Sequence, residues 1–361
     1  MKVKTKDLQE GCIVKEDVFA VTSRPLIRKK SVITQQHVEV LKAFLINEVD
    51  VEKTLINGNS FQPASGTNES ESEKESTEQT SFLDCYNLAV LTYKKMFHSW
   101  AAGTKPDTGT IRKVLSPLFA EVEKKPGIVF VLNKWNKKEE YLYHHAVAVA
   151  LLAYSLARKL GLPKKECLQA GMAGVLCDAG MSQLSPSLLY NKGFLSEKEM
   201  KELHKHPTYS YKMLKETPGI SNHVLLAVLQ HHERENGSGY PLGVTEANIH
   251  TLSRVVAVAD VYHAMTSERL YRKRQLPFQV IEEMAKKQFG KLHAETISIL
   301  MDAFLAFALN TSVLLSNGET AEIVFIDQKE ITTPFVRKKD SQDVFQVGKE
   351  EGLHISDIIV K

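Results

Sequence analysis

Apolar residues recur at intervals of three and four along the chain from Phe82 to about Val313, a spacing that predicts helices nearly throughout this stretch. The clearest run comprises Leu142, Ala146, Val149, Ala153, Leu156 and Leu160. Gly161 is expected to close that helix and Pro163 to open the next. The sequence therefore predicts a mainly helical domain over residues 82–313.

Polar residues mark further helix ends in this domain. Ser196 and Glu199 have the spacing of a capping box. Ser221 is placed to cap the apolar helix that follows it. His206 stands directly before Pro207, where we expect a helix to stop, because the residue before a proline disfavours helical backbone angles.

Short alternating and β-branched segments occupy the two ends of the chain. Residues 1–56 combine such segments with a helical pattern at 34–47, for which Thr34 is the expected N-cap, and so predict a small α+β module. Residues 314–361 return to alternating segments and predict a small β-rich element.

Residues 57–81 differ from the rest of the chain in composition. They are rich in Ser, Thr, Gly and Glu and contain almost no apolar side chains. Such a segment cannot bury enough surface to offset the entropy of ordering it. We expect a flexible acidic linker here.

Length, charge and cysteine content narrow the class of protein. A chain of 361 residues suggests two or three domains. Its formal charge of +3 gives no reason to expect DNA or a membrane as partner. The apolar run around residues 146–157 is too short to span a bilayer, and the charged opening "MKVKTKDLQE" does not resemble a signal peptide. The four cysteines form no CxxC pair, so we expect a reducing, cytoplasmic environment.

Six polar residues interrupt the apolar pattern of the helical domain. They are His145, Asp178, His206, His231, His232 and Asp260. A bare carboxylate inside an apolar helix costs several kcal/mol unless it is paired or bound to a metal. Structural roles are also open, since a core histidine is usually hydrogen-bonded and Asp260 could pair with Arg254 or Arg269.

Taken together, these residues form a mixed set of imidazoles and carboxylates, drawn from five different helices or turns. Such a set suits two hard or borderline divalent metals, with iron or manganese favoured. A structural zinc site would more often use paired cysteines. The sequence therefore favours a metal centre over scattered structural roles.

Several motifs in the same region resemble the HD-GYP family, a branch of the HD phosphohydrolase superfamily. They are "GLPKKECLQAGMAGVLCDAGM", "FLSEKEMKELHKHP", "HHERENGSGYP" and "RVVAVADVYHAMTSERLYRKR", and the match covers about residues 140–280. The resemblance implies an HD-type helical bundle with a metal centre between its helices. It also implies hydrolysis of cyclic di-GMP to linear pGpG, and sometimes on to GMP.

The resemblance also assigns roles to single residues. It implies metal ligands at His145, Asp178, His206, His231, His232 and Asp260, with Asp178 as the bridging and catalytic carboxylate. It implies that Arg269 and Arg272 hold the substrate phosphate, a task that suits the two parallel hydrogen bonds of a guanidinium. Tyr240 and Pro241 are expected to fix the loop beside the substrate.

The chain departs from the family pattern at four positions. Cys177 replaces the histidine of the HD pair and could itself ligate a metal as a thiolate. Met181 replaces the following lysine, and His263 replaces an aspartate three residues after the last ligand. Tyr141 stands where some members have a glutamate for a third metal, so we expect two metals.

Two functions stay open on these grounds. The first is a cyclic di-GMP phosphodiesterase weakened by Cys177, Met181 and His263. The second is an inactive effector that binds cyclic di-GMP or a protein partner without cutting. A third interpretation is a structural helical domain that has lost both metal and ligand. The Gly-Tyr-Pro loop is an expected contact for signalling partners, and the helices of residues 82–135 are expected to support a homodimer.

Overall fold

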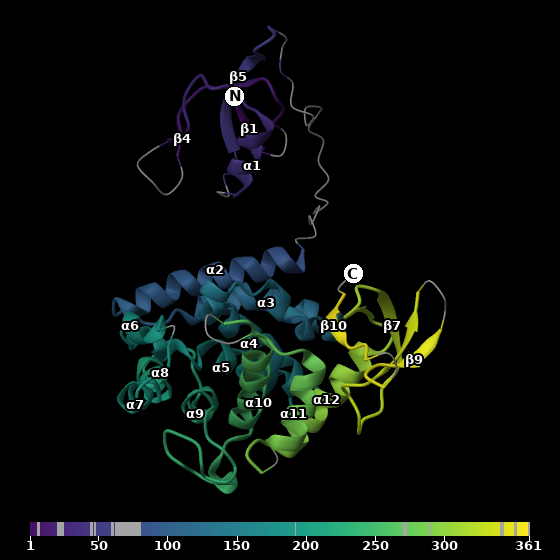
Figure 1. Cartoon of the computed structure of the whole chain (residues 1–361). Coiled ribbons are helices and arrows are strands. Elements are labelled where there is room, and N and C mark those ends of the chain that lie inside the picture. The colour runs from purple at the N-terminus through teal and green to yellow at the C-terminus, as the bar shows by residue number, and fades with distance from the viewer. Residues whose placement is uncertain are drawn as a thin grey trace. The chain divides into compact units, whose positions relative to one another are not determined.

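The computed structural model describes residues 1–5, 8–19, 25–43, 46, 48–58, 61, 81–191, 193–269, 273–288, 290–339, 343–349 and 352–359 (Figure 1). The chain divides into two compact units, Met1–Thr77 and Glu78–Lys361. Most of the predicted linker, residues 57–81, lies outside the described residues.

The first unit is a small α+β module. Its elements are β1 (Lys2–Lys4), β2 (Cys12–Val14), β3 (Val18–Phe19), β4 (Pro25–Ile27), α1 (Gln35–Ala43) and β5 (Glu48–Leu55). The strands β1, β5 and β2 form an antiparallel sheet in that order, with Val3 opposite Val49, and β3 pairs with β4. Alternation along β5 buries Val49 and Val51 against Leu41 of α1, which gives this unit its own core.

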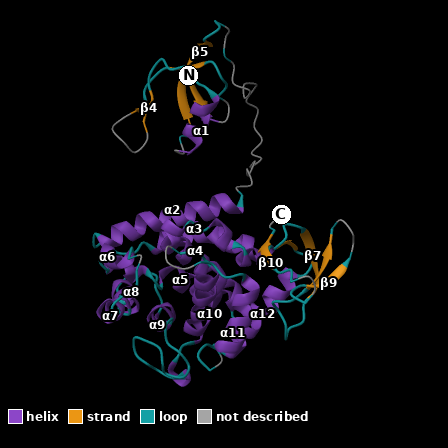
Figure 2. Ribbon diagram, viewed as in Figure 1, coloured by secondary structure: helices purple, strands orange, loops and turns teal. Residues whose placement is uncertain are grey.

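The second unit is mainly helical, as Figure 2 shows. Its first α-helices are α2 (Phe82–Ala101), α3 (Thr108–Lys124), α4 (Tyr141–Lys159), α5 (Lys164–Leu176), α6 (Pro186–Leu189) and α7 (Glu197–Leu203). They are followed by α8 (His206–Leu214), α9 (Asn222–Gln230), α10 (Thr251–Thr266), α11 (Pro277–Lys287) and α12 (Ala294–Ala308). Short 3-10 helices connect them: η2 (Pro126–Phe130), η3 (Leu132–Trp135), η4 (Lys138–Glu140), η5 (Ala179–Gln183) and η6 (Glu246–Asn248).

Helix α4 lies at the centre of the bundle and packs against α2, α5 and α10. Every residue from Tyr143 to Ala157 is buried, as expected for a helix that is apolar on all sides. Its closest neighbour is α5, where a Cβ on Gly174 would lie 2.8 Å from the carbonyl oxygen of Val149. The missing side chain lets α5 approach α4, so the polar residues at their ends come close together.

Most of the predicted helix ends have the expected chemistry. Gly161 ends α4 with a φ of +75°, which glycine adopts at little cost. Ser196 and Glu199 form the capping box of α7, and the Ser221 hydroxyl accepts a hydrogen bond from the Val224 amide.

A helix does stop before Pro207, since α7 ends at Leu203, but a second helix begins directly afterwards. His206 is the first residue of α8, and Pro207 lies in its first turn. Proline is tolerated there because the first amides of a helix have no intrahelical acceptor. The start of α8 therefore directs His206 into the bundle.

A five-stranded antiparallel sheet follows the last helix. Its strands are β6 (Ser312–Leu315), β7 (Thr320–Phe325), β8 (Phe335–Lys338), β9 (Val344–Gln346) and β10 (Ile355–Ile358), in the order β10-β6-β7-β8-β9. The first strand begins at Ser312, before the expected boundary at residue 314. The apolar run that ends at Leu315 shows neither the spacing of a helix nor the alternation of a strand. The sequence alone therefore did not locate the boundary between the last helix and the first strand of this sheet.

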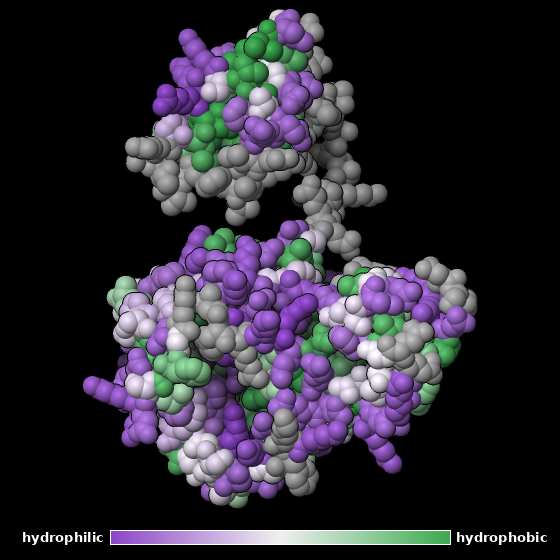
Figure 3. Space-filling model, in the orientation of Figure 1, coloured by the Kyte–Doolittle hydropathy of each residue, from purple (hydrophilic) through white to green (hydrophobic). Residues whose placement is uncertain are grey.

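The predicted fold class is confirmed: a helical HD-type domain with small sheets at both ends of the chain. The visible face of the larger unit is mostly hydrophilic, with smaller apolar patches (Figure 3). Within the described part of the chain, no helix has the length and hydropathy required to cross a bilayer.

Candidate metal centre

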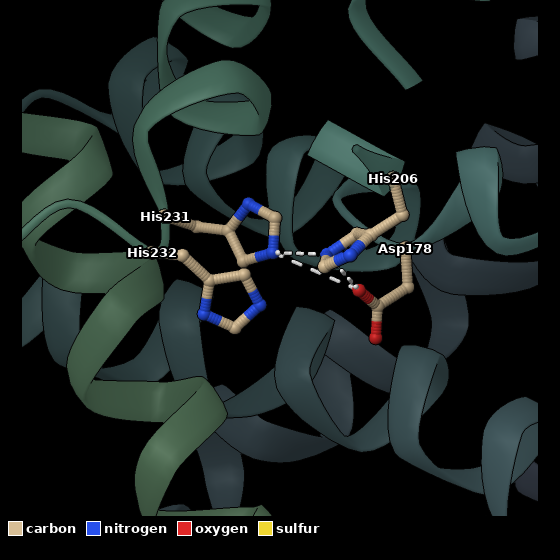
Figure 4. A group of neighbouring side chains, drawn as sticks. All are labelled: Asp178, His206, His231 and His232. Carbon is tan, nitrogen blue, oxygen red and sulfur yellow. Dashed lines mark hydrogen bonds and ion pairs between the residues drawn. The ribbon is translucent and has the colours of Figure 1, made fainter. Parts of the chain in front are cut away.

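The six polar residues singled out in the sequence converge inside the bundle. His145 belongs to α4, Asp178 follows α5, His206 begins α8, His231 and His232 follow α9, and Asp260 lies in α10. Figure 4 shows four of these side chains pointing toward one another. One donor atom each from Asp178, His206, His231 and His232 lies within 4.8 Å of every other.

Asp178 occupies the middle of this group. Its Oδ1 lies 3.2 Å from Nε2 of His206 and 3.6 Å from Nε2 of His231. Its Oδ2 lies 3.6 Å from Nε2 of His145. The two oxygens therefore face different imidazoles, which is the arrangement that a carboxylate bridging two cations requires.

Asp260 completes the second half of the group. Its Oδ1 lies 2.9 Å from Nε2 of His145, and its Oδ2 lies 3.9 Å from Nδ1 of His232. Arg254, the alternative partner considered for Asp260, lies instead 3.8 Å from Glu235. His145 therefore faces both carboxylates.

The outer nitrogens of two imidazoles fix which ring atom can bind a metal. Nδ1 of His206 lies 2.8 Å from the carbonyl oxygen of Leu203, and Nδ1 of His231 lies 2.7 Å from that of Val228. A carbonyl oxygen only accepts hydrogen bonds, so each Nδ1 carries the proton and donates it. In the neutral rings each Nε2 then presents a lone pair, as metal-ligating histidines do.

These lone pairs face an anionic oxygen in a buried space. His206 and His231 are at most 1% exposed and Asp178 is 9% exposed. Nε2 of His206, Nε2 of His231 and Oδ1 of Asp178 lie 3.2 to 3.6 Å apart, so lone pairs on all three repel one another unless a proton or a metal cation lies among them. The donor set therefore fits a borderline divalent metal of the iron or manganese type.

The pKa shifts of the two carboxylates and of His232 agree with a metal at this site. Burial raises the pKa of Asp178, but the imidazoles of His206 and His231 lower it by more, so it lies well below its usual range. Burial raises the pKa of Asp260, and its contacts with His145 and then His232 bring it below its usual value. Burial also lowers the pKa of His232 far below its usual value. Ionised carboxylates beside a neutral imidazole are in the states that metal ligation requires.

Cys177 does not join the group of donor atoms around Asp178 in the described structure. Its buried thiol donates a hydrogen bond to the carbonyl oxygen of Gly174, at 3.2 Å. Burial, and then the neighbouring charge of Asp178, raise the pKa of this thiol well above its usual value. Cys177 is thus a buried thiol hydrogen-bonded to Gly174, and its role as a thiolate ligand stays a prediction.

His263 and Tyr141 contact the outer nitrogen of His145. Nδ1 of His145 lies 2.9 Å from Nδ1 of His263 and 3.1 Å from the Tyr141 hydroxyl. The guanidinium of Arg269 lies 4.3 Å from the centre of the Tyr141 ring. This chain of contacts links the proposed phosphate-binding arginine to a proposed metal ligand.

Sequence reasoning missed the structural role of Glu233. This buried carboxylate accepts hydrogen bonds from the amides of Leu242 at 2.6 Å, Gly243 at 3.2 Å and Val244 at 3.2 Å. It therefore folds the Gly-Tyr-Pro loop back onto the end of α9. The available signal was the position of the glutamate directly after the paired histidines.

The loop in turn contacts the centre through Tyr240. Its ring stacks between those of His204 and His232, with centroid separations of 3.9 Å and 4.6 Å. A Cβ on Gly239 would lie 2.4 Å from Cα of Glu233. Glycine is required at position 239 for this close approach, which places Tyr240 against His232.

A cavity of about 480 Å³ opens over the group. His145, Asp178, His206, His232 and Asp260 are part of its lining. An apolar wall is formed by Leu142, Met181, Leu188, Leu189, Phe194 and Leu203. Arg269 and Tyr240 also line the cavity, whereas Pro241 is not part of its described lining and Arg272 lies outside the described residues.

Comparisons with known proteins agree with this geometry. Residues 131–292 match the family model described as HD domain. A cyclic di-GMP phosphodiesterase from Pseudomonas aeruginosa is 31% identical over 242 residues, which cover 67% of this chain and 58% of the relative. A cyclic di-GMP phosphodiesterase from Borreliella burgdorferi is 28% identical, over 54% of this chain and 52% of its own length. The chain thus spans little more than half the length of these curated relatives.

Other relatives broaden the picture. A 3′3′-cGAMP-specific phosphodiesterase from Vibrio cholerae is 30% identical over 48% of this chain and 40% of its own length. The solved structure of a HDG"Y"P protein from Bdellovibrio bacteriovorus aligns with a TM-score of 0.53 and 14% identity, over 84% of this chain and 98% of its own. That likeness shows the fold alone. The fold, the motifs and the relatives define an HD-domain protein, and within that class the chain belongs to the HD-GYP family.

Proposed function

We propose that this protein is a metal-dependent phosphodiesterase that hydrolyses cyclic di-GMP to linear pGpG. The observation that supports it most directly is the convergence of His145, Asp178, His206, His231, His232 and Asp260 beneath an open cavity. The names of the relatives agree, since they are phosphodiesterases of cyclic di-GMP or 3′3′-cGAMP. The cavity volume also lies in the range typical of small-molecule sites.

The reaction adds water across one phosphodiester bond. The water oxygen bonds to phosphorus, the bond from phosphorus to one sugar oxygen breaks, and that oxygen takes up a proton. Two bound iron or manganese ions would lower the pKa of the attacking water and polarise the phosphoryl oxygens.

The chain's own residues position these partners. Asp178 presents one oxygen to His206 and His231 and the other to His145, so it would hold both metals and act as the central catalytic carboxylate. Arg269 lines the same cavity and can neutralise charge on the phosphoryl group.

The test is product analysis with metal-loaded protein. Protein loaded with Mn(II) or Fe(II) is incubated with cyclic di-GMP, and in parallel with 3′3′-cGAMP, and the products are separated by chromatography. We expect pGpG from cyclic di-GMP. The Asp178→Asn variant should be slower by about a hundredfold or more, whereas Asp302→Asn, at an exposed position of α12, should match the wild type.

One observation favours a second candidate, a cyclic di-GMP-binding effector. Met181 lines the cavity where the family pattern has a lysine, so one cation is missing beside the phosphate site. In the experiment above, tight binding of cyclic di-GMP without any product would support the effector and contradict the enzyme. A protein without metal or nucleotide affinity would contradict both.

The remaining expectations stay predictions. They are a homodimer, protein partners at the Gly-Tyr-Pro loop, and a cytoplasmic location. Leu242 is the apolar side chain that this loop exposes, at 57%, so it is the first position to substitute in a search for partners.

A further inference from the structure

The segment that carries Arg269 begins and ends beside the last turn of α10. The amide of Gln275 donates a hydrogen bond to the carbonyl oxygen of Met265, at 3.1 Å, so the chain leaves α10 and returns to its last turn. Arg269 lies between these two points and donates to the carbonyl oxygen of Ala264, at 3.2 Å. The described residues of this arginine segment are 266–269, the outgoing limb, and 273–275, the returning limb, and what holds the two limbs bears on the position of Arg269.

The outgoing limb is held by η3 and by the residue that follows it. The side-chain amide of Asn133 donates to the carbonyl oxygen of Thr266, at 3.0 Å, and that of Asn136 donates to the carbonyl oxygen of Glu268, at 2.9 Å. These bonds lie within the helical bundle and fix the approach to Arg269 from one side.

The returning limb is held by the C-terminal sheet. Oδ2 of Asp357 lies 3.2 Å from the guanidinium of Arg274, and its Oδ1 lies 3.2 Å from Nζ of Lys134. Lys134 also donates to the carbonyl oxygen of Ile358. One carboxylate of the last strand thus joins the returning limb, through Arg274, to η3, through Lys134.

The strand is shaped for this contact. β10 pairs with β6, and the register shifts between Ile355 and Asp357. Such irregularities change the direction in which a side chain points. Burial raises the pKa of Asp357, but Arg274 and then Lys134 lower it by more, so the carboxylate is ionised near neutral pH.

We propose that the C-terminal β-sheet positions the substrate-binding arginine segment of the bundle, with Asp357 as the positioning residue acting through Arg274 and Lys134. This inference rests on the proposed function only in taking Arg269 as a phosphate-binding group. It gives the C-terminal sheet a part in substrate affinity, although Asp357 lies outside the residues that line the cavity as described. Misplacement of a substrate-positioning group is costly even far from the reacting atoms.

The experiment uses the full chain loaded with Mn(II). Asp357→Asn and Arg274→Gln each remove one partner of the same ion pair. Glu322→Gln is the matched control, because Glu322 pairs with Arg337 in the same sheet, at 3.1 Å, away from the arginine segment. Three quantities are measured: the Kd for cyclic di-GMP, the metal content, and hydrogen–deuterium exchange in peptides that contain Gln275.

We expect both test variants to weaken cyclic di-GMP binding by about tenfold, to exchange faster at Gln275, and to keep the metal content of the wild type. The double variant should bind cyclic di-GMP with the same Kd as whichever single variant binds it less tightly, because both changes break the same ion pair. The control should match the wild type throughout.

The proposal would be overturned if the exchange rate at Gln275 in Asp357→Asn equalled that of the wild type. It would also be overturned if exchange became faster while the Kd for cyclic di-GMP stayed the same. A loss of affinity of equal size in Glu322→Gln would overturn it too, since that would mean a general effect on the sheet. If the wild type neither binds nor cleaves cyclic di-GMP, the proposed function fails, and the exchange data alone then decide whether Asp357 holds the segment.

Discussion

The Nε2 atoms of His206 and His231 lie 3.3 Å apart, and the Nδ1 atom of each ring donates to a main-chain carbonyl oxygen. When both rings are neutral, this arrangement brings two lone pairs together beside Oδ1 of Asp178. A buried arrangement of this kind stores repulsion without a cation and releases it when a cation binds.

Metal binding should therefore stabilise the folded protein. A metal at a hundred times its dissociation constant adds about 2.7 kcal/mol if it binds only the folded chain. Thermal unfolding with a chelator and with added Mn(II) should show a clear difference in Tm. The His206→Ala variant should lose most of that difference, and a wild type whose Tm ignores Mn(II) would contradict this account of the centre.

Replacing Met181 should change catalysis more than metal binding. Met181 lines the cavity but lacks the charge that a phosphoryl group would attract. Met181→Lys is expected to raise kcat for cyclic di-GMP by about tenfold or more, because a single donor to the phosphoryl group can contribute that much. Met181→Leu is the size-matched control and should leave kcat unchanged. An unaltered kcat in a Met181→Lys variant with full metal content would show that this position does not limit the rate.

His263 is expected to tune the metal affinity through His145. Burial, and then the neighbouring His145, lower the pKa of His263 well below its usual value, so the neutral ring can accept a hydrogen bond at Nδ1. His263→Ala should weaken metal binding by about ten- to a hundredfold, the usual effect of losing a partner of a ligating histidine. His263→Asp should retain the acceptor and keep the affinity at or above that of the wild type. Titration with Mn(II) measures both, and equal affinities for all three proteins would rule out this role.

Gly239 should tolerate no side chain. A Cβ at this position would lie 2.4 Å from the amide nitrogen of Arg234 and 2.5 Å from the carbonyl oxygen of His232. Gly239→Ala is therefore expected to cost about 3 kcal/mol of unfolding free energy, the scale of other overpacked substitutions, and to displace Tyr240 from His232. Ser238→Ala, one residue earlier and exposed, is the control. Chemical denaturation provides the comparison, and an unchanged midpoint for Gly239→Ala would contradict the close approach of this loop.

The sequence predicted the parts of this structure that depend on local pattern. Periodic apolar residues and end signals such as Gly161 and Ser196 mark helices because their chemistry acts within one turn. The six residues of the centre could be named because each polar group interrupts an apolar stretch. Their distances could not be obtained, since they depend on how helices far apart in the sequence pack.

Other features depended on contacts that no local pattern contains. The thiol of Cys177 donates to the carbonyl oxygen of Gly174, and this side-chain rotamer cannot be predicted from the sequence. Glu233 is a charged residue of a kind usually found at the surface, yet it is 2% exposed and accepts hydrogen bonds from three amides 9 to 11 residues further along the chain. The contact of Asp357 with Arg274 joins residues more than 80 positions apart.

Anomalous diffraction from crystals of protein loaded with Mn(II) or Fe(II) tests the central claim most directly. The account predicts two peaks, one within bonding distance of Asp178, His206 and His231, and the other within bonding distance of Asp178, His145 and Asp260, with His232 a ligand of one of the two. Fully loaded crystals with no peak at these side chains, or with metal held elsewhere on the chain, would contradict it.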